Sequence, residues 1–143
     1  MLDTRLFPPD FRGKYPHMFP EDLKVWERFL DRYGSLYTGF YYDITCGEKS
    51  PRFPSWKPEY KKDAAILSRL RIDAVGVRPA TIDIIEIKPR GNMAAMGQVL
   101  TYMEHYKKEY KPKMPLRGLI VCGEIDPNII TLLEKNHLAY TVV

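Results

Sequence analysis

The chain has 143 residues, of which 45% are hydrophobic and 28% charged, so it is long enough to bury a core as one domain. No apolar stretch approaches the roughly 18 residues needed to span a membrane, which excludes a membrane-spanning protein. The net charge of +4 is mild, so its distribution along the chain matters more than its total. Cys46 and Cys122 lack CxxC spacing, and we expect a reducing, intracellular (cytoplasmic) location.

Residues 1–19 contain Pro8, Pro9 and Pro16 together with several aromatic residues, and we predict an irregular arm outside the main domain of residues 20–143. This arm has three alternative roles: it covers the sheet, links two protomers, or docks on another protein.

A helix is predicted over residues 20–33, because Pro20 suits a first helical position and Gly34 suits a stop. Glu21 and Asp22 lie in its first turn, where acids are favoured. The apolar residues recur at helical spacing and form a core stripe with Glu27 on its flank: Leu23, Trp26, Leu30 and Tyr33.

Residues 36–45 are aromatic and β-branched and predict a first strand, after which a proline-rich stretch carries an excess of positive charge. We predict a loop there, with a short helix near residues 61–70. Basic side chains neutralise phosphates and exposed aromatic rings stack on bases, although a solvated connector is the alternative interpretation. With Arg90 further on, the predicted nucleic-acid contacts are Lys49, Arg52, Lys57, Lys61, Lys62 and Arg71.

Residues 71–88 predict a β-hairpin with Asp73 on its first strand and Glu86-Ile87-Lys88, thirteen residues later, on its second. Alternate strand residues share a face, so Glu86 and Lys88 project together. Two carboxylates brought together suit Mg²⁺ or Mn²⁺, and a nearby lysine can position water or stabilise negative charge. An ordinary solvated strand face carries the same residue types, so the next segment matters.

A helix is predicted over residues 92–110, with a methionine-rich core stripe and with Gln98, Tyr102 and His105 on a neighbouring face. Starting directly after the Lys88 strand, it would hold Gln98 and Tyr102 over the same cleft. A second basic cluster follows and is either a solvated helix end or a distal phosphate contact: Lys107, Lys108, Lys111, Lys113 and Arg117.

The tail predicts a strand at residues 116–122, a helix starting at Asp126-Pro127 and a strand at residues 139–143. The resulting order, α-β-β-β-α-β-α-β, indicates an α/β fold with a mixed central sheet flanked by helices.

Over residues 71–143 the sequence resembles the PD-(D/E)XK nuclease superfamily, especially its RecB-like and NucS-like branches. The motifs that carry the resemblance are IDAVG (72–76), EIK (86–88), QVLTY (98–102) and the strand–helix–strand tail (117–142). One departure is Ile72 before the acid, where the family commonly has proline.

The resemblance implies a restriction-endonuclease-like fold and a role for each motif residue. Asp73 and Glu86 would be metal ligands with the Ile87 carbonyl, and Lys88 would be catalytic. Gln98 would orient the site, and Tyr102 would contact the substrate backbone or pack beside Gln98. An acid from the first helix often adds to such sites; Glu27 matches best, with Asp31 as the second choice.

We therefore expect a metal-dependent nuclease that acts on DNA, with specificity given by a homodimer or a partner protein. Two alternatives stay open. One is a non-catalytic module of the same fold that binds nucleic acid, and the other is a structural adaptor protein, for example of a phage or mobile element.

Overall fold

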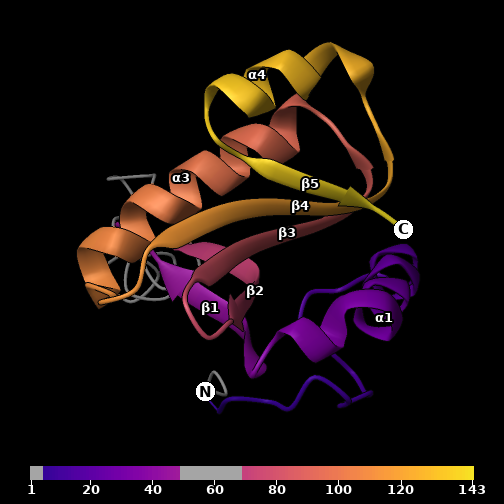
Figure 1. Ribbon diagram of the computed structural model, residues 1–143, viewed down its shortest axis with the longest axis vertical. Helices are drawn as coiled ribbons and strands as arrows, with labels where there is room; N and C mark the ends of the chain where they lie inside the picture. Colours follow the sequence, from indigo (N-terminus) through magenta and orange to yellow (C-terminus); the bar gives the residue numbers. More distant parts are fainter. Residues whose placement is uncertain (1–4, 49–68) are drawn as a thin grey trace, which may run out of the picture.

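The computed structural model describes residues 5–48 and 69–143, which form a five-stranded sheet with helices on both faces. Helices α3 and α4 cover one face and α1 lies against the other (Figure 1). The elements in chain order are α1 (Pro20–Tyr33), η1 (Gly34–Leu36), β1 (Gly39–Cys46), β2 (Leu70–Val77), β3 (Ile82–Gly91), α3 (Met93–Tyr110), β4 (Leu116–Ile125), η2 (Pro127–Ile129), α4 (Ile130–Lys135) and β5 (Ala139–Val142). None of the helices within these ranges has both the length and the apolar character required to cross a bilayer.

The sheet is mixed, as the sequence predicts. Its strands are ordered β1-β2-β3-β4-β5, with antiparallel pairing between β1, β2 and β3 and parallel pairing between β3, β4 and β5. The predicted short helix near residues 61–70 falls mostly outside the described residues, and Leu70 begins β2. The predicted order of the other helices and strands is confirmed.

Local sequence explains where the two long helices begin and end. Pro20 opens α1 and Gly34 follows its last residue, so the predicted bounds of this helix are confirmed. Asn92 caps α3, and its side chain accepts a hydrogen bond from the Ala95 amide. Trp26 is fully buried between α1 and the sheet, where its indole N–H donates to the Tyr42 hydroxyl at 3.1 Å.

The described part of the N-terminal arm packs onto the sheet. Phe7 and Phe40 exchange two main-chain hydrogen bonds of 2.8 and 2.9 Å, so the arm pairs briefly with the outer edge of β1. Tyr15 is buried against Tyr42, with ring centroids 4.6 Å apart. Of the three alternatives for the arm, covering the sheet is therefore the one that these contacts support.

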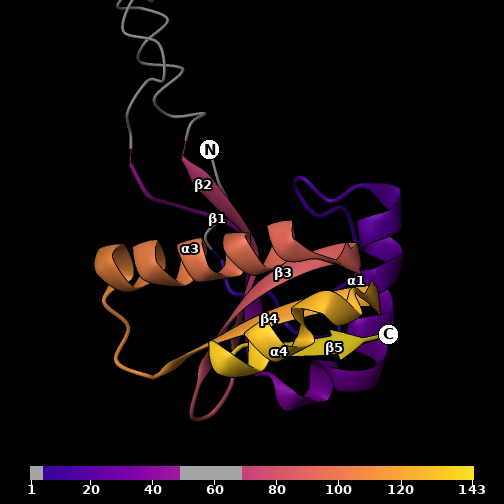
Figure 2. The same ribbon diagram turned by 90° about the horizontal axis from the view of Figure 1, so that it is seen from above.

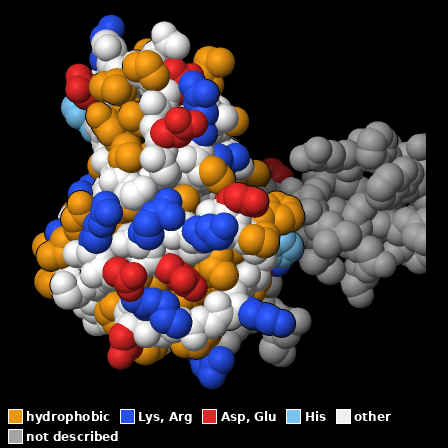
Figure 3. Space-filling view, turned by 90° about the vertical axis from the view of Figure 1, so that its right-hand side faces the viewer, with side chains coloured by type: hydrophobic (Ala, Val, Ile, Leu, Met, Phe, Trp, Pro, Cys, Tyr) orange, Lys and Arg blue, Asp and Glu red, His pale blue; other side chains and the backbone are white. Residues whose placement is uncertain are grey.

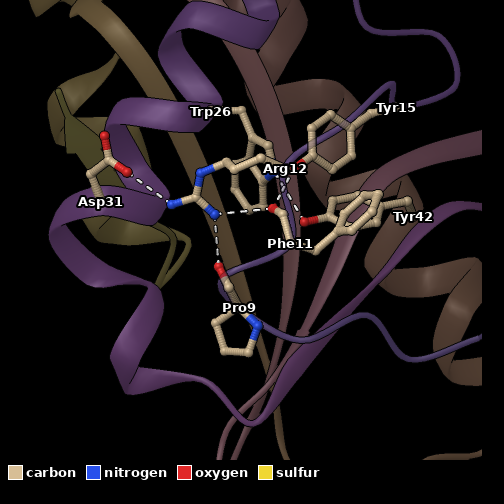
Figure 4. Close-up of polar contacts among 7 residues, drawn as sticks. All are labelled: Pro9, Phe11, Arg12, Tyr15, Trp26, Asp31 and Tyr42. Carbon is tan, nitrogen blue, oxygen red and sulfur yellow. Dashed lines mark hydrogen bonds and ion pairs between the residues drawn. The ribbon is translucent and has the colours of Figure 1, made fainter.

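Arg12 fastens this arm to α1. Its guanidinium donates to Asp31 at 2.8 Å and to the carbonyl oxygens of Pro9 and Phe11 at 3.0 Å (Figure 4). Asp31 is thus engaged with the arm.

Strands β2 and β3 diverge after a short shared segment, and this divergence creates the place for a site. Their register runs from Val77↔Ile82 to Ala74↔Ile85. Strand β3 continues to Gly91 beside β4, further than the predicted end at Lys88, and includes Pro89. A proline lacks the N–H that a ladder needs, but Pro89 follows the segment that is paired with β2, so no ladder bond to β2 is lost.

Candidate active site

The predicted acid pair lies at the point where β2 leaves β3. Asp73 on β2 accepts a hydrogen bond from the Ile87 amide of β3 at 2.9 Å. At this position a side-chain carboxylate, and not a main-chain carbonyl of β2, accepts the hydrogen bond from β3. Glu86 is 4% exposed, and its Oε1 lies 3.9 Å from the Lys88 ammonium nitrogen. The structure thus brings together Asp73, Glu86 and Lys88, as the sequence predicts.

The pKa values of both carboxyl groups are raised, so ionising both at once is unfavourable. Burial raises the pKa of Glu86 to about 9, and the neighbouring Asp73 charge adds to the rise. Burial also raises the pKa of Asp73 to about 6, although the hydrogen bond from the Ile87 amide opposes the rise. Each of these shifts would be reversed by a cation placed between the acids.

Gln98 and Tyr102 come from α3 and lie beside these acids. The Gln98 amide donates to the Tyr102 hydroxyl at 3.3 Å. The pKa of Tyr102 is raised, first by burial and then by the charges of Glu86 and Asp73, so its hydroxyl lies within electrostatic reach of the pair. The structure thus brings Gln98 and Tyr102 together on the side of α3 that is near the acids, and their roles in the site stay predictions.

The acid of α1 that acts on the pair is Asp22, in the first turn of the helix. Its charge contributes to the raised pKa of both Asp73 and Glu86. Asp22 also accepts a hydrogen bond from the Phe19 amide at 3.1 Å, so it caps the helix as well. Glu27 instead acts on Arg12 and Tyr15, toward the N-terminal arm.

The interactions of Glu27 thus lie on the side of the arm, and its role as a metal ligand stays a prediction. The flank of the core stripe favours Glu27, whereas the acid whose charge acts on the pair comes from the first turn of α1. The preference for acids in the first turn of a helix was the available signal for Asp22.

Of the predicted nucleic-acid contacts, Arg71 and Arg90 are described, whereas Lys49, Arg52, Lys57, Lys61 and Lys62 lie outside the described residues. Arg71 makes a bidentate ion pair with buried Asp43 at 2.8 and 2.5 Å, so much of its charge is already neutralised. Arg90, at the end of β3, is exposed. The role of both arginines in nucleic-acid binding stays a prediction.

Asp43 has an unusual main-chain conformation that the sequence does not predict. It lies in the middle of β1 with a positive φ of 54°, is 4% exposed, and also has His17 within 3.9 Å. Its neighbours Tyr42 and Ile44 pair with Ala74 and Ile72, so Asp43 is level with Asp73 on the adjacent strand.

Arg117, which belongs to the basic cluster predicted from the sequence, is held in an ion pair with a buried acid. It makes a bidentate pair with Asp83 at 3.0 and 2.6 Å, and Asp83 is fully buried. The Tyr37 hydroxyl donates to the same carboxylate at 2.6 Å. A distal phosphate contact by Arg117 is therefore not favoured.

The surface charge is mixed on the face that lies at right in Figure 1. Lys and Arg side chains follow one another across this face, and Asp and Glu side chains lie beside them (Figure 3). The positive charge of the chain is therefore not gathered into a single-sign field on this side.

The donor set available to a metal consists of the Asp73 and Glu86 carboxylates. Within residues 5–48 and 69–143, no three His, Cys, Asp or Glu side chains are assembled as a metal site. The same part of the chain provides no hydrogen-bond partner for the buried Glu86 Oε2 or for Gln98 Oε1. Buried polar atoms are rarely left unpaired, so the unpartnered carboxylate oxygen of Glu86 favours a ligand at the acid pair.

The fold is an α/β fold with a mixed five-stranded central sheet flanked by helices, and the acid pair lies where β2 leaves β3. Among solved structures, the chain is similar to a repair endonuclease from Pyrococcus abyssi, with a TM-score of 0.53 and 19% identity over 92% of this chain. It is also similar to EndoMS in its complex with double-stranded DNA, with a TM-score of 0.51 and 17% identity over 93% of this chain.

These comparisons confirm the predicted fold class. The chain spans about half the length of the two solved proteins, since 49% of each is covered. No family model and no curated protein matches the sequence.

Proposed function

We propose that this chain is a metal-dependent nuclease that hydrolyses phosphodiester bonds in DNA. The observation that carries the proposal is the pair of partly buried Asp73 and buried Glu86, with Glu86 Oε2 unpartnered among the described residues and Lys88 beside it. Perturbed carboxylates with a nearby cationic side chain are typical of catalytic sites. Further support comes from the similar solved structures, since one is a repair endonuclease and the other is EndoMS in complex with double-stranded DNA.

The residues present fit a divalent cation. Mg²⁺ is commonly held by one or two carboxylates, with substrate phosphate oxygens and water completing its shell. Asp73 and Glu86 would hold it, with the Ile87 carbonyl as a third donor, and Asp22 would add negative charge nearby. When bound, Mg²⁺ or Mn²⁺ supplies a Lewis acid for a phosphoryl oxygen and lowers the pKa of water.

The other residues have separate tasks in this proposal. Lys88 orients the attacking water or stabilises the charge that develops on the phosphate. Gln98 fixes the position of Tyr102 through its hydrogen bond, and the two side chains border the cleft on the α3 side. The burial of Glu86 limits the access of bulk water, which strengthens electrostatic interactions within the site.

The decisive experiment measures cleavage of labelled single-stranded, duplex, flap and four-way-junction DNA with Mg²⁺ or Mn²⁺. We expect Asp73→Asn and Glu86→Gln to abolish cleavage, and Lys88→Met to lose turnover but still bind metal. Glu134→Gln and Lys135→Met are matched controls on α4, because both residues are exposed, and they should cleave normally.

Three results would contradict the proposal in different ways. Normal cleavage by Lys88→Met would refute the role given to this lysine. DNA binding without cleavage, under all metal conditions, would favour a non-catalytic module of the same fold. Neither binding nor cleavage would leave the adaptor interpretation.

A further inference from the structure

An exposed tyrosine lies at the far end of the helix that borders the site. Tyr110, the last residue of α3, is 45% exposed, although aromatic rings are usually more buried. It is fixed on two sides. One ring face stacks on Tyr106, with centroids 4.7 Å apart and planes 24° apart, and the hydroxyl donates to the Thr45 carbonyl at 2.8 Å.

Tyr110 is thus held in place by two contacts while 45% of its surface stays open to solvent. Because the stacking and the hydrogen bond hold the ring, little side-chain conformational entropy would be lost when a ligand stacks on it. Flat, rigid and exposed aromatic rings are typical platforms for bases of single-stranded nucleic acid.

Tyr110 belongs to a row of three tyrosines on α3 that begins near the acids. Tyr102, Tyr106 and Tyr110 recur every four residues on α3, and the charges of Glu86 and Asp73 act on the Tyr102 hydroxyl. At 1.5 Å per residue, Tyr110 lies about 12 Å further along the helix axis. In Figure 2, α3 runs from the Gly91 end of β3 toward the side on which the chain leaves β1 and enters β2.

Positive charge accompanies the platform. Lys107, Lys108 and Lys111 are exposed in and directly after the last turn of α3. Lys108 makes an exposed ion pair with Glu104 at 3.5 Å, whereas Lys107 and Lys111 form no ion pair with any described residue. A nucleic-acid strand that reached Tyr110 would therefore meet cations for its phosphates.

We propose that Tyr110 is a stacking platform for an unpaired base, so that the preferred substrate of this nuclease is DNA with a single-stranded segment next to the cut. A base in an intact duplex is stacked on both faces and paired, so only an unpaired base can lie on this ring. The proposal rests on the proposed function for its cleavage site, but the binding that it predicts does not require cleavage.

The test is the affinity of the full chain for fluorescein-labelled (dT)12 and for a 12-base-pair duplex, measured by anisotropy in EDTA. We expect Tyr110→Ala to weaken (dT)12 binding about tenfold, within the range for one stacked base, and to leave duplex binding within about twofold. Tyr110→Phe keeps the ring and should stay within about threefold of the unaltered chain. Tyr140→Ala, at an exposed tyrosine on β5, is the matched control and should have no effect.

A second pair of measurements guards against a folding defect. Tyr110→Leu keeps an apolar contact for Tyr106 but has no flat ring, and it should lose (dT)12 affinity while its melting temperature stays close to that of Tyr110→Phe. Replacing Lys107 and Lys111 together by Gln should lower the salt slope of (dT)12 binding by about 1.4.

Several outcomes would overturn the platform: no (dT)12 binding by the unaltered chain, unchanged binding by Tyr110→Ala, or equal losses for (dT)12 and duplex. A chain that cleaves no DNA but loses (dT)12 binding with Tyr110→Ala would refute the proposed function and support the platform. Cleavage with unchanged (dT)12 binding would do the reverse.

Discussion

Lys88 Nζ lies 3.9 Å from Glu86 Oε1, two residues away on the same strand, and this is too long for a hydrogen bond. The lysine charge therefore stabilises the ionised form of Glu86 without forming a hydrogen bond to it. Glu86 Oε2 has no hydrogen-bond partner in the described part of the chain. An acid held in this way binds either a proton or a cation. Both choices can be measured.

The first prediction concerns stability and pH. The pKa of Glu86 is raised from 4.5 to about 9, so the folded chain holds this proton more tightly than the unfolded chain. The stability of the metal-free protein should therefore fall as pH rises between these values. We expect Glu86→Gln to be about 2 kcal/mol more stable than the unaltered chain at pH 8, and equally stable near pH 4. Urea unfolding in EDTA measures this difference, and equal stability at pH 8 would contradict it.

The second prediction separates the two acids of α1. Asp22 acts on the pair and Glu27 acts on Arg12 and Tyr15, so only the first should influence a bound cation. We expect Asp22→Asn to weaken Mn²⁺ binding about fivefold, since an interaction of about 1 kcal/mol is removed. Asparagine can still accept from the Phe19 amide, so the helix cap is retained. Calorimetric titration should show Glu27→Gln unchanged; the opposite ranking would restore Glu27.

The third prediction distinguishes Arg71 from Arg90. Arg71→Ala leaves the buried Asp43 carboxylate without its bidentate partner, and we expect a loss of about 3 kcal/mol of stability. Arg90→Ala should stay within about 0.5 kcal/mol, because the residue is exposed, and should weaken DNA binding. Denaturant unfolding and anisotropy on both variants give the two numbers. A stable Arg71→Ala protein with weakened DNA binding would contradict this prediction and would show that Arg71 contacts DNA.

The fourth prediction concerns the buried trio of Tyr37, Asp83 and Arg117. Arg117→Met strands a fully buried carboxylate, and we expect a cost of roughly 3–5 kcal/mol. Adding Asp83→Asn should recover part of the loss, because the uncompensated charge is then removed. The salt dependence of DNA binding should not change in the double variant. A stable Arg117→Met protein with a lower salt slope would show that this arginine contacts phosphates.

The fifth prediction tests the basic segment that lies outside the described residues. Replacing Lys57, Lys61 and Lys62 together by Gln should lower the salt slope of duplex binding by about 2.7, if each contacts one phosphate. Lys24→Gln with Lys135→Gln is the control, on α1 and α4. An unchanged slope in the triple variant would place the nucleic-acid surface elsewhere.

Much of this architecture follows from local sequence rules. Pro20 and Gly34 mark the ends of α1, and alternation along β3 places Glu86 and Lys88 together. The spacing of Gln98 and Tyr102 gives their common face on α3. These features depend on residues close together in the chain, where periodicity and capping chemistry are informative.

The features that sequence rules missed depend on tertiary packing. A helical wheel shows which residues flank a core stripe, but not which of them lies near the acids of another strand, and so it gives no signal for the effect of Asp22 on the pair. Arg71 was predicted to be available for phosphates because its partner, Asp43, is 28 residues away. The positive φ of Asp43 within a strand has no signal in the sequence.

The Ile87 amide gives a way to observe the site without turnover. Its hydrogen-bond acceptor is the Asp73 carboxylate, whereas the paired residues of β2 and β3 bond through their main chains. Its nuclear magnetic resonance shift and its rate of exchange with deuterium therefore depend on whether that carboxylate is protonated, ionised or shared with a cation. One isotope-labelled backbone nitrogen thus reports the state of the acid pair at equilibrium, even in a variant that cannot cut DNA.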